Sequence, residues 1–169
     1  MRKGLCLCLA LCCLAGLTAC VQSEENPQAP FACYYLQSEL TYGEADSVIG
    51  CEYQEASGHE SDYVWMLDRY LTGPESETLT SPFPRGTMLY SFEIVNAAAY
   101  VDLSADFAEL TGMALTVGCV CLTQTVIAMT GCETVVISAD DSLLDGSKSI
   151  TMTADSYLLL DSSAATESD

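Results

Sequence analysis

The sequence predicts an α+β domain in which a small antiparallel or mixed sheet is packed by two helices. Three observations support this fold class: short runs that alternate between apolar and polar residues, two segments of helical periodicity among them, and turn-forming residues at their boundaries. We expect a single domain over residues 31–160. A domain of this size buries about 70% of its unfolded surface, so its core requires neither metals nor disulfides.

The first half of this domain is expected to start with two strands, over residues 31–36 and 47–53, joined by a turn at residues 43–46. A helix then runs to about residue 71. Ser57 and Glu60 are spaced as a capping box for this helix, and Ser61 is a competing cap. Gly73-Pro74 ends it, because glycine adopts the left-handed cap conformation and proline cannot continue a helix. The side chains at core-facing intervals are Val64, Leu67 and Leu71.

The middle of the chain predicts a β-hairpin, with strands over residues 88–95 and 98–103 around Asn96-Ala97. Alternation assigns one core-facing side to each strand. The residues expected on these sides are Met88, Tyr90, Phe92 and Ile94 in the first strand and Ala99, Val101 and Leu103 in the second. Tyr100 and Asp102 are expected on the opposite face. A short helical turn over residues 105–110, capped by Ser104, follows the hairpin.

The stretch from residue 110 to residue 132 contains no charged residue and is long enough to span a membrane as a helix. It also holds five Thr, three Gly and Gln124, which make membrane insertion much less favourable than for a Leu-rich segment. A strand-like run, Val135-Val136-Ile137, follows shortly afterwards. We therefore expect residues 115–129 to form a buried helix packed on the sheet, with a spanning segment as the alternative.

The C-terminal part of the chain is marked by turns at Asp140-Asp141 and Asp145-Gly146. Two short edge strands are expected over residues 149–153 and 156–160. Residues 161–169 are small and acidic, and we expect a disordered tail there.

The start of the chain has the layout of a secretory signal: two basic residues, an apolar run from residue 5 to residue 17, and Leu17-Thr18-Ala19-Cys20 at the cut. This tetrapeptide resembles the bacterial lipobox, which implies cleavage after residue 19 and diacylglyceryl transfer to the Cys20 thiol. We expect residues 1–19 to be a lipoprotein signal peptide and residues 20–30 a flexible tether. Two acyl chains on Cys20 would anchor the chain stably on the extracytoplasmic face of the cell membrane. The alternative is an ordinary secreted protein in which Cys20 lies near the cut.

Charge excludes one class of partner. The full chain has five basic residues, 24 acidic residues and a formal net charge of −19, and the cleavage would remove two of the five basic residues. Such a polyanion is repelled by phosphates, so no nucleic-acid partner is expected. The same charge keeps the domain away from anionic lipid headgroups, which leaves the lipid anchor as its only membrane attachment.

Ten cysteines suggest a disulfide framework until they are sorted by position. Four lie in the signal peptide and Cys20 is the lipid acceptor, which leaves Cys33, Cys51, Cys119, Cys121 and Cys132. An odd number of widely spaced cysteines is a poor disulfide framework. We expect mostly unpaired core cysteines, with a Cys33–Cys51 bridge as the alternative because the two lie on adjacent expected strands.

No catalytic residues, cofactor or metal are expected. The single histidine, His59, lies in a polar stretch and is expected to be solvated rather than paired with a nucleophilic cysteine. Cys119 and Cys121 point to different sides of a helix, which argues against a zinc site. A weak calcium site stays open as an alternative at two sets of oxygens: Asp102, Ser104 and Asp106, and Asp140, Asp141 and Asp145.

Tyrosines are candidates for recognising a partner or a glycan, among them Tyr34, Tyr35 and Tyr100. Tyr34 and Tyr35 face opposite sides of a strand, so at least one of them belongs to the core. A hydrolase using two carboxylates is a third hypothesis, although 24 acidic residues supply candidate pairs in any fold.

Several motifs in order carry a family resemblance: Leu71-Thr72-Gly73-Pro74, Pro84-Arg85-Gly86-Thr87 and Ala99-Tyr100-Val101-Asp102-Leu103-Ser104, followed by the apolar helix and Val135-Val136-Ile137. This arrangement resembles the GerMN domain of bacterial sporulation and spore-germination proteins. The segment after residue 140 is longer than the short Asp-Gly turn usual in that family.

The resemblance implies a small α+β fold similar to ring-building modules, used for assembly on the outside of a Gram-positive cell and without catalysis. The expected partners are envelope or sporulation-complex proteins, or a second copy of the chain. The alternative is an envelope lipoprotein that binds peptidoglycan or a small molecule.

Overall fold

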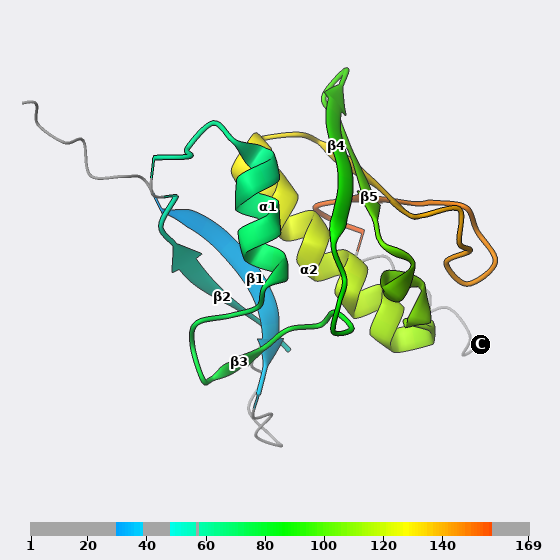
Figure 1. The fold of residues 1–169 in the computed structure, drawn as a ribbon, viewed down its shortest axis with the longest axis horizontal. Helices are drawn as coiled ribbons and strands as arrows, with labels where there is room; N and C mark the ends of the chain where they lie inside the picture. The colour runs from blue at the N-terminus through cyan, green and yellow to red at the C-terminus, as the bar shows by residue number, and fades with distance from the viewer. Residues whose placement is uncertain (1–29, 39–47, 57, 157–169) are drawn as a thin grey trace, which may run out of the picture.

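The computed structural model describes residues 30–38, 48–56 and 58–156. Their strands form two sheets, and two helices lie with them (Figure 1). The three-stranded sheet has the order β2-β1-β3 and consists of β1 (Phe31–Gln37), β2 (Ile49–Gln54) and β3 (Leu79–Thr80). The four-stranded sheet has the order β4-β5-β6-β7 and consists of β4 (Leu89–Val95), β5 (Ala98–Leu103), β6 (Thr134–Ala139) and β7 (Ile150–Thr153).

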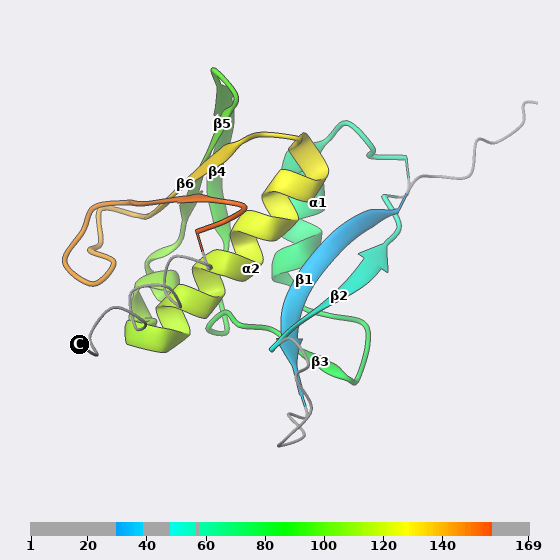
Figure 2. The same cartoon turned by 180° about the vertical axis from the view of Figure 1, so that it is seen from behind.

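The helices are α1 (Tyr63–Leu71) and α2 (Gly112–Thr130), with a 3₁₀ helix, η1 (Ala105–Glu109), before α2. β5 and β6 are parallel, with η1 and α2 in the connection between them, whereas all other pairs are antiparallel. α2 contacts β1 as well as β6 and β7, so it lies between the two sheets (Figure 2). The α+β fold class with two helices and a mixed sheet is confirmed, but the strands divide into two sheets.

The division into two sheets depends on one edge of β1, which is only partly paired with another strand. β3 pairs only with the last two residues of β1, so most of that edge has no neighbouring strand. Side chains from the helices form hydrogen bonds with backbone groups along this edge instead. The Tyr34 N–H donates to Thr125 Oγ1 at 2.9 Å, and the Tyr70 hydroxyl donates to the Tyr34 carbonyl at 2.8 Å. A threonine in the apolar helix α2 thus replaces a strand, which meets the need of a buried backbone group for a partner.

The N-cap of α1 lies one residue after Ser61, the expected competing cap. Asp62 is the N-cap, and its carboxylate accepts from the Trp65 N–H at 3.0 Å. The expectations of a Ser57–Glu60 capping box and of a Ser61 cap are therefore both wrong, because Glu60 and Ser61 lie before the N-cap; Ser57 itself lies outside the described residues. An aspartate accepts this bond with a full negative charge, which also favours the positive end of the helix.

The buried face of α1 is also shifted relative to the expected one. Met66, Leu67 and Tyr70 are buried, whereas Val64 is 47% exposed. The cause is aromatic packing: the Tyr70 ring lies 4.9 Å from the Tyr35 ring and 5.4 Å from the Phe83 ring, centroid to centroid. Burying this large ring turns the helix so that Tyr70 replaces Leu71 at the centre of the core.

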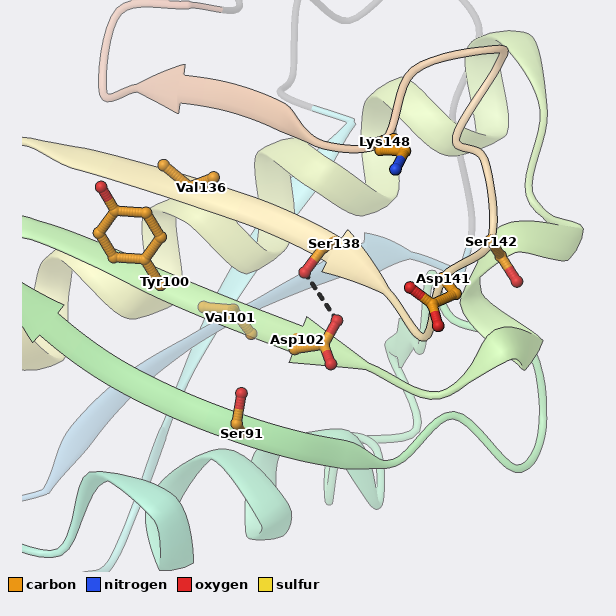
Figure 3. A pocket seen from close by; sticks show the side chains of 9 residues that line it. All are labelled: Ser91, Tyr100, Val101, Asp102, Val136, Ser138, Asp141, Ser142 and Lys148. Atoms are coloured by element: carbon orange, nitrogen blue, oxygen red, sulfur yellow. Dashed lines mark hydrogen bonds between the residues drawn. The ribbon is translucent and has the colours of Figure 1, made fainter.

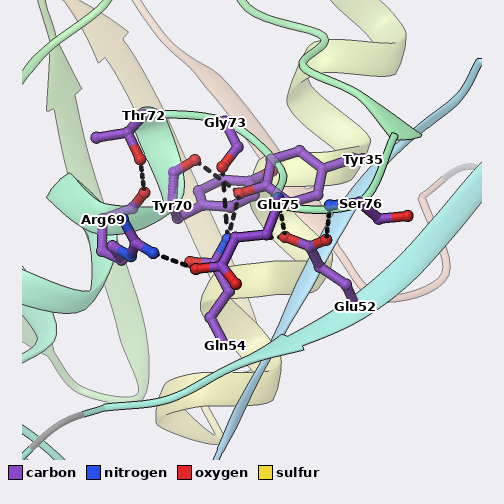
Figure 4. A network of polar contacts seen from close by, with 9 residues as sticks. All are labelled: Tyr35, Glu52, Gln54, Arg69, Tyr70, Thr72, Gly73, Glu75 and Ser76. Atoms are coloured by element: carbon purple, nitrogen blue, oxygen red, sulfur yellow. Dashed lines mark hydrogen bonds and ion pairs between the residues drawn. The ribbon is translucent and has the colours of Figure 1, made fainter. Parts of the chain in front are cut away.

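The end of α1 is fixed to the three-stranded sheet by Glu52 of β2 (Figure 4). Gly73 has φ +106°, as expected for a glycine that ends a helix. In the loop that follows, the N–H groups of Glu75 and Ser76 both donate to the Glu52 carboxylate at 3.0 Å. Gln54 Nε2 donates to the same carboxylate at 2.8 Å and to the Tyr35 hydroxyl at 3.3 Å.

α2 forms the centre of the core, as expected for a buried helix. Its inward residues pack against both sheets, and the buried ones are Leu115, Gly118, Cys119, Val120, Cys121, Leu122, Thr123, Thr125 and Val126. By length and composition alone this helix is long and apolar enough to cross a membrane. Its packing on β1, β6 and β7 supports the core assignment over the spanning alternative.

The C-terminal part follows the expected turns. Asp140, Asp141 and Asp145 have positive φ angles, and β7 covers Ile150–Thr153 close to the expected strand. The expected strand at 156–160 and the acidic tail at 161–169 lie almost wholly outside the described residues, and so do the signal peptide and the tether up to residue 29.

Candidate interaction surface

The β4–β5 hairpin, defined here as residues 88–103, projects from the fold at its turn (Figure 1). Val95 and Ala98 pair across its two-residue turn. Asn96 (φ 50°) and Ala97 (φ 62°) both have positive φ angles, as a type I′ turn requires. This turn matches the natural twist of two antiparallel strands, so the expected hairpin and its turn are confirmed.

Exposed apolar side chains gather on this hairpin. Ten large hydrophobic residues are exposed in the described part of the chain, and half of them form what we call the hairpin patch: Met88, Tyr90, Ile94, Val95 and Tyr100. Each of these five is between 43% and 56% exposed. Single exposed apolar side chains are ordinary, but here five lie around one hairpin, with Ile94 on the face of Ala99 and with Val95 and Tyr100 on the opposite face.

The hairpin patch includes residues that were expected in the core. Met88, Tyr90 and Ile94 are exposed, and only Phe92 of that set is partly buried, against Tyr63 of α1 at 5.9 Å between ring centroids. The reason is a shift of register between Leu89 and Ser91, which leaves Tyr90 without a partner in β5. Such a bulge changes the face to which the preceding residues point, and Ile94 lies too near the turn to be covered.

On β5 the expected alternation holds. Ala99, Val101 and Leu103 are buried, and Tyr100 and Asp102 lie on the opposite face. Of the three tyrosines considered as recognition residues, Tyr35 is fully buried and Tyr34 is half-buried, while Tyr100 is 45% exposed. Tyr100 is therefore the tyrosine of that group that the fold presents to solvent.

A shallow polar hollow lies on the open face of the four-stranded sheet and includes part of the hairpin (Figure 3). Its volume is about 360 Å³, and it is lined by Ser91, Tyr100, Val101, Asp102, Val136, Ser138, Asp141, Ser142 and Lys148. Asp102 Oδ1 accepts from the Ser138 hydroxyl at 2.6 Å and from the Asp140 N–H at 3.3 Å. The hollow thus combines one ammonium group, two carboxylates, three hydroxyls of serine and one aromatic ring.

The carboxylates considered for calcium accept hydrogen bonds from hydroxyl and backbone N–H groups. Asp106 accepts from the Ser104 hydroxyl at 2.9 Å, and Asp145 accepts from the Gly112 N–H at 2.9 Å. Ser104 caps η1 by position but not by its side chain, which accepts instead from the Met88 N–H at 3.1 Å. Among the described residues, no group of three or more His, Cys, Asp or Glu side chains is arranged to hold a metal.

The cysteines of the described chain are all free thiols. Cys33 is buried and pairs with Glu52, whereas Cys51 pairs with Tyr34 and is exposed, so the two thiols point to opposite faces of the sheet. The alternative of a Cys33–Cys51 bridge is therefore wrong for this register. Burial raises the pKa of Cys119 and of Cys121 to about 12, which keeps both as neutral thiols at physiological pH.

His59 stacks on the Trp65 ring at 4.4 Å between centroids, and its Nδ1 lies 3.5 Å from the Asp62 carboxylate. These contacts place it at the start of α1. The lipid acceptor expected from the sequence, Cys20, lies outside the described residues.

Comparison with known proteins identifies the fold. The family model described as "Germane: Sporulation and spore germination" matches residues 33–145, which is more than half of the 169-residue chain. No match to a curated protein is found.

Two solved structures are similar to the chain. The tandem GerMN domains of the sporulation protein GerM from Bacillus subtilis are 17% identical, with a TM-score of 0.50 over 70% of this chain and 43% of that one. A candidate lipoprotein from Clostridium perfringens is 16% identical, with a TM-score of 0.42 over 75% of this chain and 89% of that one. The chain spans less than half of the GerM structure, which contains two such domains. The motifs, the two-helix α+β fold and the family match agree, and the chain belongs to the Germane (GerMN) family of sporulation and spore germination.

Proposed function

We propose that this chain is a lipid-anchored, non-enzymatic GerMN module that assembles with envelope or sporulation-complex proteins on the extracytoplasmic face of the cell membrane. Its role would lie in sporulation or spore germination, the processes named for its family. The observation that carries the assembly role is the hairpin patch, five exposed apolar side chains on a projecting hairpin of an otherwise strongly acidic chain.

The lipid anchor is supported by the sequence Leu17-Thr18-Ala19-Cys20 after an apolar run. Intact-mass analysis of the chain extracted from membranes tests it. We expect a mature protein that begins at Cys20 and carries two ester-linked acyl chains, with or without a third on the amino group. A mature chain that starts elsewhere, or that carries no lipid, would contradict the anchor without affecting the fold.

The proposal that the chain is not an enzyme is supported by the burial and the contacts of the thiols, the imidazole and the carboxylates that could act in catalysis. Cys33, Cys119 and Cys121 are buried thiols whose pKa burial raises, so none of them offers a thiolate to a substrate. The imidazole of His59 stacks on Trp65, and the cysteines of the described residues are free thiols. The polar hollow holds carboxylates, but one of them is already bonded to Ser138 and Asp140.

The assembly role is tested by affinity purification of the tagged full-length chain from growing and from sporulating cells. The informative variant removes the hairpin patch with Tyr90→Ser, Ile94→Thr and Val95→Thr. The matched control changes three exposed apolar residues elsewhere, Val64→Thr, Met113→Gln and Leu143→Asn. We expect envelope proteins to be recovered with the wild type and the control, and recovery to fall about tenfold or more with the hairpin variant.

The polar hollow favours a second candidate function, the binding of a peptidoglycan fragment or small polar molecule. Lys148 tests this candidate because it lines the hollow and is separate from the hairpin patch. Calorimetry with soluble peptidoglycan fragments would show binding that Lys148→Ala weakens about tenfold if this function is correct. Absence of heat with the wild type would remove the second candidate and leave the assembly role untouched.

A further inference from the structure

We propose that the protein partner adds a β-strand along the free edge of β4 and that this strand carries Lys or Arg side chains. This inference rests on the proposed assembly function and names the mode of binding and the chemistry of the partner. Among the described residues β4 is the edge of the four-stranded sheet, has seven residues, and is longer than β7 at the opposite edge, which has four. An edge strand presents unpaired N–H and C=O groups to an added chain.

The register identifies which backbone groups face outward. Val95 and Ala98 flank a two-residue turn, so they form a hydrogen-bonded pair, and such pairs alternate along an antiparallel ladder. Ile94↔Ala99 and Phe92↔Val101 are therefore the non-hydrogen-bonded pairs of this hairpin. The N–H and C=O groups of Phe92 and Ile94 point away from β5, toward the free edge. The bulge at Tyr90 limits the regular edge to residues 91–95.

The side chains along this edge do little to prevent pairing. Residues 88–101 contain neither Lys nor Pro, the residues that most often protect an edge strand. Tyr90, Ile94 and Val95 are exposed on it and offer apolar contact to an added strand. Glu93 is the single charged residue among residues 88–101, and it lies between the two outward-facing backbone positions.

Glu93 determines the chemistry of the occupant. If a second copy paired through the outward groups of Phe92 and Ile94, its own Glu93 would lie directly opposite Glu93. Like charges directly opposite each other destabilise a strand pair. The full chain also carries a net charge of −19, so long-range attraction favours a basic partner over a second copy. A Lys or Arg opposite Glu93 would turn the same position into a favourable cross-strand pair.

The test uses the full-length chain in cells, with the photo-crosslinking residue p-benzoylphenylalanine in place of Tyr90. Crosslinked partners are identified by mass spectrometry of the joined peptides. We expect an envelope protein joined through an extended segment that contains Lys or Arg. A joined peptide from this chain itself, or from an acidic or helical segment, would overturn the inference.

Two pairs of variants separate strand addition from simple apolar contact. Ile94→Pro removes an outward N–H and the side chain, whereas Ile94→Ala removes the side chain alone, and proline is tolerated where an edge N–H faces solvent. We expect the crosslinking yield of Ile94→Pro to be about fivefold below that of Ile94→Ala.

The second pair tests the charge of the partner. Glu93→Lys should lower the yield about tenfold, while Glu109→Lys, on the exposed surface of η1, should change it less than about twofold.

The outcomes distinguish this inference from the function on which it rests. Equal yields for the proline and alanine variants, or no effect of Glu93→Lys, would overturn strand addition by a basic segment while the assembly role stands. Circular dichroism establishes that each variant is folded, and the Glu93 pair tests the inference even if Ile94→Pro unfolds. Capture of no envelope protein at Tyr90, in growing or sporulating cells, would contradict the assembly role itself.

Discussion

Glu52 is a single side chain on which the loop after α1 depends. Its carboxylate accepts from the backbone N–H groups of Glu75 and Ser76 and from Gln54. We expect Glu52→Gln to lower the free energy of unfolding by about 1–2 kcal/mol, because charge-assisted bonds to backbone groups become neutral ones. Urea denaturation measures the change. Glu77→Gln, in the same loop, is the control and should change stability by less than about 0.5 kcal/mol.

The contribution of Glu52 also depends on pH. Burial alone would raise the pKa of this carboxyl, but the bonds from Gln54, Glu75 and Ser76 outweigh it and hold the pKa below its ordinary value. A lowered pKa in the folded state means that the stabilisation is present above the pKa of the unfolded chain and is lost as the pH falls through the folded pKa. The difference in stability between the wild type and Glu52→Gln should therefore be full at pH 7 and shrink below about pH 4.5. A difference that grows on acidification would contradict this.

Ala97 has a φ angle of 62° at the second position of the hairpin turn. Alanine adopts this left-handed conformation at a cost of about 1 kcal/mol, and glycine adopts it freely. We expect Ala97→Gly to stabilise the domain by about 0.5–1 kcal/mol in urea denaturation. Ala98→Gly, one residue later and inside β5, should instead destabilise it. A destabilising Ala97→Gly would show that the turn is not type I′.

At the scale of elements, the effect of substitutions in α2 on stability tests whether this helix is buried in the core. Leu122 is fully buried in the core. We expect Leu122→Ala to lower the free energy of unfolding by about 2–4 kcal/mol through lost burial and the cavity that remains. Met113, at the start of the helix, is 77% exposed, and Met113→Ala should change stability by less than about 0.5 kcal/mol. Equal effects of the two changes in urea denaturation would contradict the packing of α2.

The elements predicted from the sequence were those with local signals. The hairpin around Asn96-Ala97, the apolar helix and the strand at residues 134–139 appear where periodicity and turn residues place them. The buried face of α1 was not predictable, because it depends on how Tyr70 packs between Tyr35 and Phe83, residues far away in the sequence. The exposed side of β4 was not predictable either, because the bulge at Tyr90 arises from pairing with β5 and no residue near it signals an extra position.

At the scale of the whole molecule, charge is the dominant feature. The net charge of −19 creates repulsion in the folded domain that salt screens. We expect the Tm to rise by roughly 3–6 °C between 10 mM and 300 mM NaCl at pH 7, which corresponds to about 1 kcal/mol. Near pH 4, where most carboxyls approach half protonation, the same change of salt should have a much smaller effect. A Tm that does not respond to salt at pH 7 would contradict the repulsion.

The candidate surface was only partly predictable at this scale. Composition predicted that nucleic acid is not a partner, which stays a prediction, and the ordered motifs indicated the family. The hairpin patch was not predicted, because Met88, Tyr90 and Ile94 are apolar residues of the kind found in a core, and their exposure follows from the bulge and from the closeness of Ile94 to the turn. Of the five residues of the hairpin patch, Tyr100 was expected on the face of its strand opposite the core, and it is exposed.

The central claim, that the β4–β5 hairpin is the surface through which this module assembles, is tested most directly by hydrogen–deuterium exchange. Deuterium uptake is compared between the purified full-length chain and the same chain within the envelope complex captured from sporulating cells. We predict slower uptake over residues 88–101 in the complex, with little change in α2, whose amides are already protected in the core. Unchanged uptake over residues 88–101, with protection confined to another surface such as the three-stranded sheet, would contradict the claim.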